Sequence, residues 1–224
     1  LGQPDHNSNL SSNGGVSAAS LAFPIGVHYD GRKLFVSDYN HRRIQIWNSL
    51  PTSNMQPANV VLGHTAMTHS NPNDNGSNVS GPPSANNNAG GYGLFSDGQR
   101  LFYADSNNHR VLIWNSIPAS NYQAADVVLG HPDFSYSLYN DNGSNVTGSP
   151  SASNLYFPIS VFSDGRSLYV ADYNNHRVLM WDKIPTSNGA AANRVLGQTV
   201  MTTANAGCSA AGVYNPGGIF GDGA

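Results

Sequence analysis

The chain has 224 residues with 10 basic and 13 acidic side chains, which gives a formal net charge of −3. It lacks the basic excess of a nucleic-acid-binding protein, and no run of about 18 apolar residues is available to span a membrane. All 13 acidic residues are Asp and only Lys33 and Lys183 are lysines, so a mainly helical fold, whose surface normally needs Glu and Lys, is excluded.

An internal repeat of 67 residues organises the chain. Three tryptophans mark the repeat, because Trp47, Trp114 and Trp181 follow one another at intervals of 67 residues. The segments 101–118 and 168–185 are identical at 12 of 18 positions. Such self-similarity indicates that each repeat is one supersecondary unit.

Each unit is predicted to contain four short strands, the first of which ends in an Asp-Gly turn. In the first unit the strands are expected at Pro24–Asp30, Leu34–Ser37, Ile44–Trp47 and Val60–Leu62. The second unit has them at Gly91–Asp97, Leu101–Ala104, Val111–Trp114 and Val127–Leu129. In the third they are expected at Pro158–Asp164, Leu168–Ala171, Val178–Trp181 and Val195–Leu196. One further first strand is expected at Pro216–Asp222.

The predicted strands are apolar on both faces, as in Leu34-Phe35-Val36. Strands of this kind are buried on both sides, either in a parallel sheet covered by helices or in sheets stacked face to face. Because no helical segment separates the strands, the predicted fold is an all-β propeller of four-stranded blades with essentially no helix. The tryptophans of the third strands are expected to pack between blades or at the outer rim, with sugar stacking by these rings or by Tyr39 and Tyr173 as the alternative.

The turn between the second and third strands carries a resemblance to a known family. It reads Asp-Tyr-Asn-Asn-His-Arg-Val at 172–178 and recurs at 105–111, whereas the first unit has His41 one place earlier and Arg42 in the usual His position. With Leu-Gly-Gln-Pro-Asp at 1–5, the chain resembles the bacterial long-unit NHL-repeat proteins. The resemblance implies one propeller region over 1–224, with units at about 1–63, 64–130 and 131–197 and a partial unit at 198–224.

Three complete blades and one orphan first strand are fewer than the roughly 4–8 blades that close a propeller. We therefore expect the span to be part of a longer chain, which is the favoured reading, or of an oligomer that completes the ring. Alone it is not expected to be a stable monomer. An isolated span would expose two apolar surfaces to solvent. These are the face of the first blade, with Leu34, Ile44 and Ile46, and the edge of the strand Pro216–Asp222.

An Asp and an Arg recur at each of these turns as a structural repeat motif: Asp38, Arg43, Asp105, Arg110, Asp172 and Arg177. The carboxylate is expected to accept N–H groups of an Asx-type turn, and the arginine to reach the Asp of the neighbouring blade. Asparagines two residues after each Asp suit left-handed backbone positions: Asn40, Asn107 and Asn174. A structural role is favoured over catalysis, because a catalytic residue is rarely copied in every unit.

Two sets of equivalent histidines are candidate zinc ligands: His109 with His176, and His64 with His131. In a propeller these turns and the blade-to-blade connections open on one face, so such histidines could converge on the axis, as in related amidating lyases. Local packing of each histidine is the favoured alternative, since no HExxH pattern is present.

The long connections each contain an Asn-Asp-Asn-Gly-Ser-Asn segment. Clustered side-chain oxygens beside a Gly turn resemble calcium loops, so calcium is the candidate cofactor. Its candidate ligands are Asp74, Asn75, Asp141 and Asn142. A loop that satisfies its own backbone is the favoured alternative, because the bidentate Glu of an EF-hand cannot exist in a chain without Glu.

The long connections and the turns are predicted to form one binding face, because loops on a rigid scaffold usually carry binding. Its candidate residues are Tyr39, His41, Asn108, His109, Tyr173, Asn175 and His176. The predicted function is a non-enzymatic extracellular, cell-surface or periplasmic scaffold that binds protein or glycan, and no catalytic residue is assigned. The alternative is a metal-dependent (zinc or calcium) propeller lyase or lactonase.

Overall fold

The computed structural model describes residues 1–221 and is all-β. Within these residues the strands form three four-stranded sheets, each with its strands paired antiparallel in chain order. The first sheet contains β1 Pro24–Tyr29, β2 Leu34–Asp38, β3 Arg43–Trp47 and β4 Val60–Leu62. The second contains β5 Leu94–Ser96, β6 Leu101–Asp105, β7 Arg110–Trp114 and β8 Val127–Leu129. The third contains β9 Pro158–Ser163, β10 Leu168–Asp172, β11 Arg177–Trp181 and β12 Arg194–Leu196.

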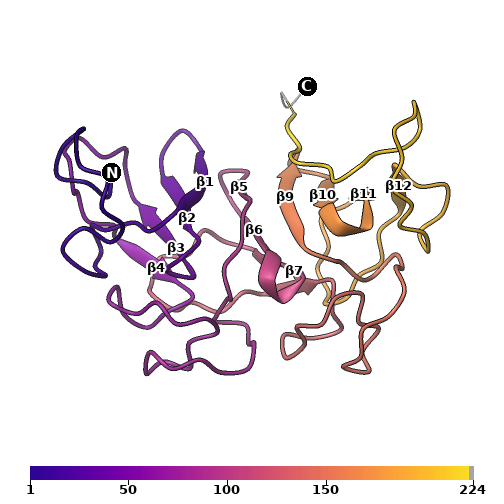
Figure 1. The fold of residues 1–224 in the computed structure, drawn as a ribbon, viewed down its shortest axis with the longest axis horizontal. Coiled ribbons are helices and arrows are strands. Elements are labelled where there is room, and N and C mark those ends of the chain that lie inside the picture. The colour runs from indigo at the N-terminus through magenta and orange to yellow at the C-terminus, as the bar shows by residue number, and fades with distance from the viewer. Residues whose placement is uncertain (222–224) are drawn as a thin grey trace.

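The sheets follow one another as the blades of a propeller do (Figure 1). Strand β5, the first of the second sheet, contacts both β1 and β9, the first strands of its neighbours. Helical structure in the described part of the chain amounts to two 3-10 turns, η1 Ser106–Asn108 and η2 Tyr173–Asn175. The predicted all-β fold with three complete blades is confirmed, and the blades form an open arc.

The Asp-Gly turns between the first and second strands form as the sequence predicts. Asp30 Oδ1 accepts the backbone N–H groups of Arg32 and Lys33 at 2.9 and 2.7 Å, while Gly31 has a φ of +91° that side chains disfavour. Short polar side chains and glycine thus reverse the chain at one end of each sheet. The long connections 63–90 and 130–156 lie along the lower edge of the view in Figure 1, the first on the left and the second on the right.

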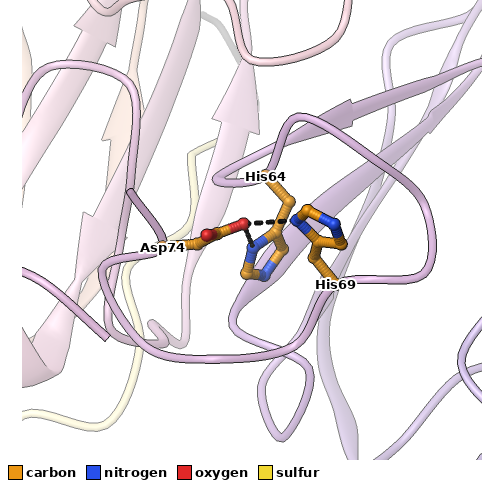
Figure 2. Close-up of side chains that lie close together, drawn as sticks. All are labelled: His64, His69 and Asp74. Carbon is orange, nitrogen blue, oxygen red and sulfur yellow. Dashed lines mark hydrogen bonds and ion pairs between the residues drawn. The ribbon is translucent and has the colours of Figure 1, made fainter. Parts of the chain in front are cut away.

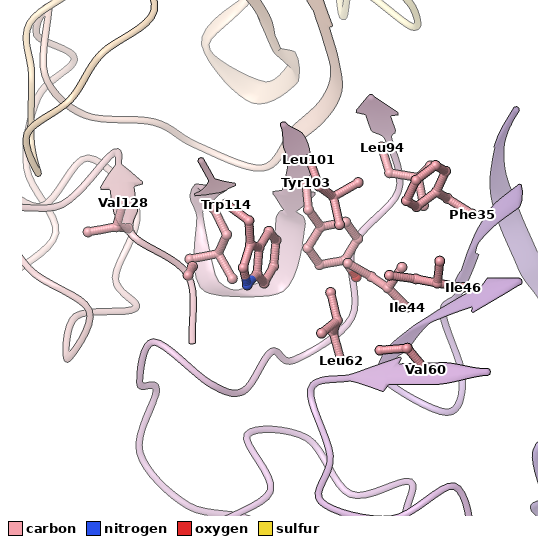
Figure 3. Packing of buried hydrophobic residues seen from close by; sticks show 12 residues of the cluster. Phe35, Ile44, Ile46, Val60, Leu62, Leu94, Leu101, Tyr103, Trp114 and Val128 are labelled. Atoms are coloured by element: carbon pink, nitrogen blue, oxygen red, sulfur yellow. The ribbon is translucent and has the colours of Figure 1, made fainter. Parts of the chain in front are cut away.

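Two apolar cores lie between the sheets. The first joins Phe35, Ile44 and Ile46 of the first sheet to Tyr103 and Trp114 of the second (Figure 3). The second core joins the second and third sheets in the same way and includes the third tryptophan, Trp181. Each tryptophan is at most 3% exposed, which excludes the indole rings from sugar stacking and confirms that they pack in the core.

The expectation that the first blade exposes its apolar face is wrong for the residues named. Ile44 and Ile46 point into the first core and are fully buried, and Leu34 is 8% exposed. Leu21, from the segment before β1, packs with Leu34 on the opposite face of the sheet and covers it. The exposed apolar surface is instead on β1, where Val27 is 73% exposed.

The additional strand expected at Pro216–Asp222 does not form over the described residues. Residues 216–221 have no regular secondary structure, and Asp222 lies outside the described part of the chain. The backbone N–H of Ile219 donates to Ser160 Oγ at 3.1 Å, so the segment touches β9 through a side chain. A strand is defined by backbone pairing with a neighbour, and residues 216–221 form no such pairing.

Glycines allow the first strands of adjacent sheets to approach closely. A Cβ on Gly26 would lie 2.2 Å from the carbonyl oxygen of Tyr92, and one on Gly93 would lie 2.6 Å from that of Ile159. Any side chain at these positions would push the sheets apart.

In residues 1–221 no helix is both long and apolar enough to cross a lipid bilayer.

Candidate functional site

The turns between second and third strands build the same buried ion pair in every sheet. The arginine Nε lies 2.9 Å from the Asp Oδ2 in the first sheet, 2.8 Å in the second and 2.7 Å in the third. The pairs are Asp38–Arg43, Asp105–Arg110 and Asp172–Arg177. Because both side chains of each pair are fully buried, the pair closes its turn from inside the protein.

Each arginine pairs with the Asp of its own sheet, so the expected pairing with the neighbouring blade is wrong. The remaining N–H groups reach the two connections that flank the sheet: Arg110 donates to the carbonyls of Asn87 and Phe134, each at 2.8 Å. The carboxylate also differs from the expected Asx turn, since Asp38 Oδ1 accepts the N–H of Ala22 at 2.7 Å, 16 residues earlier. The motif therefore fastens both connections to the sheet.

The left-handed positions of these turns lie two residues later than expected. Positive φ occurs at Arg42, His109 and His176, not at Asn40, Asn107 and Asn174. His109 Nδ1 accepts the N–H of Phe157 at 3.1 Å, and His176 Nδ1 accepts that of Asn215 at 3.3 Å. Each histidine thus binds the residue that directly precedes the proline of the next predicted first strand. In residues 1–221 neither His109 nor His176 belongs to a group of three metal-ligating side chains, so these two histidines do not form the candidate zinc site, and each makes a local hydrogen bond, which was the favoured alternative.

Three of the predicted face residues are buried and face inward. His41, Asn108 and Asn175 occupy the same repeat position and are at most 4% exposed. Each donates to the Oδ2 atom of its turn's Asp, at distances of 2.7 to 2.8 Å. His41 therefore replaces the usual Asn as a donor to the carboxylate. Because they are buried, these three residues cannot contact a ligand on the surface.

Tyr39, His109 and Tyr173 lie in or beside a row of aromatic rings that crosses the sheets, whereas His176 stacks on Tyr214. The aromatic row consists of Phe23, Tyr39, Tyr92, Phe157 and Tyr173. Successive ring centroids are 6.1, 5.2, 5.6 and 6.5 Å apart, with the rings mostly edge to face. Every ring is partly or largely exposed, and His109 packs against Phe157 at 6.4 Å.

The row draws on residues that sequence reasoning missed. Tyr39 and Tyr173 come from the turns and are among the predicted face residues, whereas Phe23, Tyr92 and Phe157 come from the segments that lead into the first strands. No repeat signal marks Tyr92, because its equivalents are Ile25 and Ile159. The contacts between these rings arise where the first strands of adjacent sheets meet.

The two Asp/Asn loops satisfy much of their own backbone. Asp74 Oδ1 accepts the N–H groups of Gly76 and Asn78 at 2.9 and 2.8 Å, and Asp141 Oδ1 accepts three N–H groups of its loop. Asn75 Oδ1 accepts the N–H of Ser77 at 3.1 Å. Asn142 is exposed. Asp74 Oδ2 faces two imidazole rings, and nitrogen is not a calcium ligand, so the donor set there does not fit calcium.

One group in the described residues places three metal-ligating side chains together. Figure 2 shows that His64 and His69 both point their rings at Asp74. The Nδ1 atoms of His64 and His69 lie 3.0 and 2.7 Å from Asp74 Oδ2. The repeat in the sequence groups His64 with His131 as a candidate ligand and does not point to His69. The spacing His-x4-His-x4-Asp within one connection is the signal that would have found this group.

No protein-family model matches the chain, and no curated protein matches it by sequence. A putative 6-phosphogluconolactonase from Bacteroides uniformis matches in structure at 14% identity and a TM-score of 0.44, covering 81% of this chain and 44% of that one. The periplasmic gluconolactonase of Pseudomonas aeruginosa matches at 20% identity and a TM-score of 0.41, covering 79% and 43%.

A chain of a nidogen/laminin complex matches at 16% identity and a TM-score of 0.37, covering 78% of this chain and 52% of that one. The chain thus spans about half or less of the length of these structures. At such identities the likeness is one of fold alone and says nothing about activity or partners.

Proposed function

We propose that this protein is a non-enzymatic binding module that acts outside the cytoplasm and takes a glycan or a protein as its ligand. The aromatic row supports this proposal more directly than any other feature. It places five partly exposed rings in edge contact across three rigid sheets. The location outside the cytoplasm follows from the resemblance to NHL-repeat proteins.

Tyrosine suits this role because it offers a large, rigid contact surface with a polar tip at a low entropic cost. Tyr39 is held in place by Asn107, whose Nδ2 donates to the tyrosine hydroxyl at 3.2 Å and to the carbonyl of Ala89 at 2.9 Å. Rings that combine an apolar face with a hydroxyl group suit the alternating apolar faces and hydroxyls of a sugar chain. A glycan is therefore the first ligand class to test.

The proposal is tested on a glycan array with the wild-type chain and the variants Tyr92→Ala and Tyr39→Ala. We expect each variant to lose at least about tenfold in affinity, the usual effect of truncating a central aromatic contact. Tyr29→Ala is the matched control, because Tyr29 is 45% exposed and does not belong to the row. Unchanged binding in Tyr92→Ala would contradict the proposal.

A protein ligand would be tested with the same three variants by measuring binding to intact extracellular matrix or cell surfaces. The competing class is a metal-dependent lyase or lactonase. Turnover of an aldonolactone that is abolished by a chelator and unaffected by Tyr92→Ala would favour that class over a binding module.

A further inference from the structure

The side chains of His64, His69 and Asp74 bring together three of the four ligand atoms that a tetrahedral metal site needs. The two Nδ1 atoms and the carboxylate oxygen lie within 4.8 Å of one another, and both nitrogens are directed at the same oxygen, Asp74 Oδ2 (Figure 2). His64 and Asp74 are fully buried, whereas the His69 side chain is 18% exposed. The group is thus enclosed on one side and reachable from solvent on the other.

In a neutral His64 ring, the contact between Nδ1 and Asp74 Oδ2 has no proton to share. Its Nε2 atom lies 2.8 Å from the carbonyl oxygen of His41, which can only accept, so Nε2 carries the proton. In a neutral imidazole Nδ1 then has a lone pair, and it faces the lone pairs of Asp74 Oδ2 at 3.0 Å. Two acceptors in contact need a cation between them, either a second proton on this buried ring or a metal ion.

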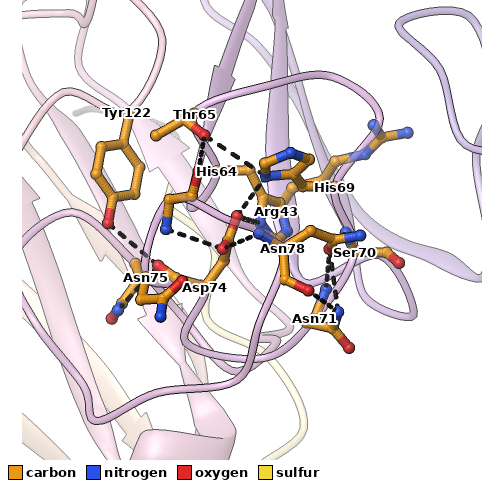
Figure 4. A network of polar contacts seen from close by, with 12 residues as sticks. Arg43, His64, Thr65, His69, Ser70, Asn71, Asp74, Asn75, Asn78 and Tyr122 are labelled. Carbon is orange, nitrogen blue, oxygen red and sulfur yellow. Dashed lines mark hydrogen bonds and ion pairs between the residues drawn. The ribbon is translucent and has the colours of Figure 1, made fainter.

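The outer contacts are those that a metal site requires. Metal-ligating histidines usually donate their other ring N–H to a backbone carbonyl or carboxylate, which is the contact of His64 with His41. Asp74 Oδ1 is held by the N–H groups of Gly76 and Asn78, so Oδ2 is the oxygen left for coordination. In Figure 4 the surrounding network includes Tyr122, whose hydroxyl donates to the backbone carbonyl of Asp74 at 3.1 Å. These contacts orient both side chains before any ion arrives.

We propose that His64, His69 and Asp74 bind a divalent transition-metal ion, zinc being the best match, with water completing a tetrahedral shell. Two imidazole nitrogens and one carboxylate oxygen suit zinc, whereas calcium and magnesium take oxygen ligands. Ligand atoms at about 2.0–2.2 Å from a tetrahedral ion are about 3.3–3.6 Å apart, so the Nδ1–Oδ2 separations of 3.0 and 2.7 Å must lengthen when the ion binds. The site is separate from the aromatic row and does not depend on the proposed binding function.

The second unit contains the same position with one ligand changed. His131 and Asp141 are the repeat equivalents of His64 and Asp74, and Tyr136 stands where His69 would be. His131 Nε2 again lies 2.8 Å from a backbone carbonyl, that of Asn108. Its Nδ1 atom and Asp141 Oδ2 are both buried without a hydrogen-bond partner. The second unit therefore keeps two of the ligands and lacks the third, which makes it an internal control.

The test is zinc binding to the untagged chain, measured by equilibrium dialysis with elemental analysis, and cobalt binding, measured by visible absorption. We expect one zinc ion per chain and the intense absorption bands of tetrahedral cobalt. His69→Tyr copies the residue that the second unit already accommodates, so it should fold with the circular dichroism and thermal melt of the wild type. We expect it to bind zinc at least about 100-fold more weakly, since even outer-shell changes cost about 10–100-fold.

Two further variants separate this site from adventitious binding. His6→Tyr removes an exposed histidine elsewhere and should leave one zinc bound. Tyr136→His should raise the stoichiometry to two by restoring the third ligand in the second unit. Absence of zinc binding by the wild type, or a folded His69→Tyr variant with unchanged affinity, would overturn the proposal. A Tyr136→His variant that still binds one ion would overturn the role given to the third imidazole.

Discussion

Arg110 Nε donates to Asp105 Oδ2 at 2.8 Å, and neither side chain has any contact with solvent. The guanidinium also binds carbonyls of the connections before and after its sheet. One side chain therefore holds together three segments that are distant in the sequence. The same arrangement in the other two sheets makes this pair the main polar link between connections and strands.

Removing this arginine should cost much of the stability of the fold. Arg110→Met leaves the Asp105 carboxylate buried without its partner, which typically lowers the free energy of unfolding by about 3–5 kcal/mol. Urea denaturation followed by circular dichroism measures the loss. Arg194→Met is the control, because the Arg194–Asp182 pair is 60% and 50% exposed and should contribute less than about 1 kcal/mol. Equal losses in the two variants would contradict the structural role of the motif.

Gly93→Ala should separate the second and third sheets. The added methyl would lie 2.6 Å from the carbonyl oxygen of Ile159 and 2.8 Å from the Cα of Ser160, both backbone atoms that cannot move aside. We expect the free energy of unfolding to fall by about 1–3 kcal/mol, as for other overpacked sites. Gly218 occupies the equivalent repeat position and has no atom within 4 Å of an added Cβ. Gly218→Ala should therefore unfold at the wild-type urea concentration; a matching loss there would show that the close approach is not the cause.

His109 should make the fold less stable in mild acid. Burial, with a smaller contribution from the nearby His131, lowers the pKa of His109 to about 4, against about 6.5 in an unfolded chain. The ring is neutral in the fold, where Nδ1 accepts the N–H of Phe157 and the rings of Tyr139 and Tyr156 make T-shaped contacts with the imidazole. Between these pH values the unfolded chain binds the extra proton. Stability is therefore fully present above pH 6.5 and is lost as the pH falls towards 4, by at most about 3 kcal/mol.

The measurement compares urea denaturation of the wild type and His109→Gln at pH 7.0 and at pH 4.5. Glutamine keeps an acceptor for the N–H of Phe157 and does not titrate. Because other groups titrate alike in both proteins, the wild type should lose more stability than the variant on acidification. Equal losses would mean that His109 does not contribute to the pH dependence.

The open side of the first sheet should cause self-association of the 224-residue span. Val27 and Tyr29 on β1 are 73% and 45% exposed, beside an apolar groove of about 320 Å³ lined by Leu21, Ile25 and Leu34. An apolar sheet face open to solvent favours association. Light scattering at increasing concentration should show a mass above 23.7 kDa, and Val27→Lys should reduce it. A monodisperse particle of 23.7 kDa at all concentrations would contradict the prediction that this exposed surface causes self-association.

Strand content was predictable because its signals are local. The repeated tryptophans, the Asp-Gly turns and strands apolar on both faces placed the strands to within three residues, and they indicated stacked sheets rather than a helical fold. The first strand of the second unit is shorter than expected, at Leu94–Ser96, and Pro216–Asp222 pairs with nothing over its described residues. Tyr92 and Gly93 exchange only two backbone hydrogen bonds with Ala104, and Ile219 donates to the side chain of Ser160 and not to a backbone carbonyl.

The repeat in the sequence by itself determined the sheets, their order and the burial of Trp47, Trp114 and Trp181 between or beside them. Only the tertiary structure decided that Arg110 binds its own sheet's Asp105, and that Asn108 turns inward while Tyr92 joins the exposed aromatic row. The physical reason is distance along the chain. A strand pattern reports on residues a few positions apart, whereas ion pairs, buried donors and ring contacts depend on segments that packing of the sheets brings together.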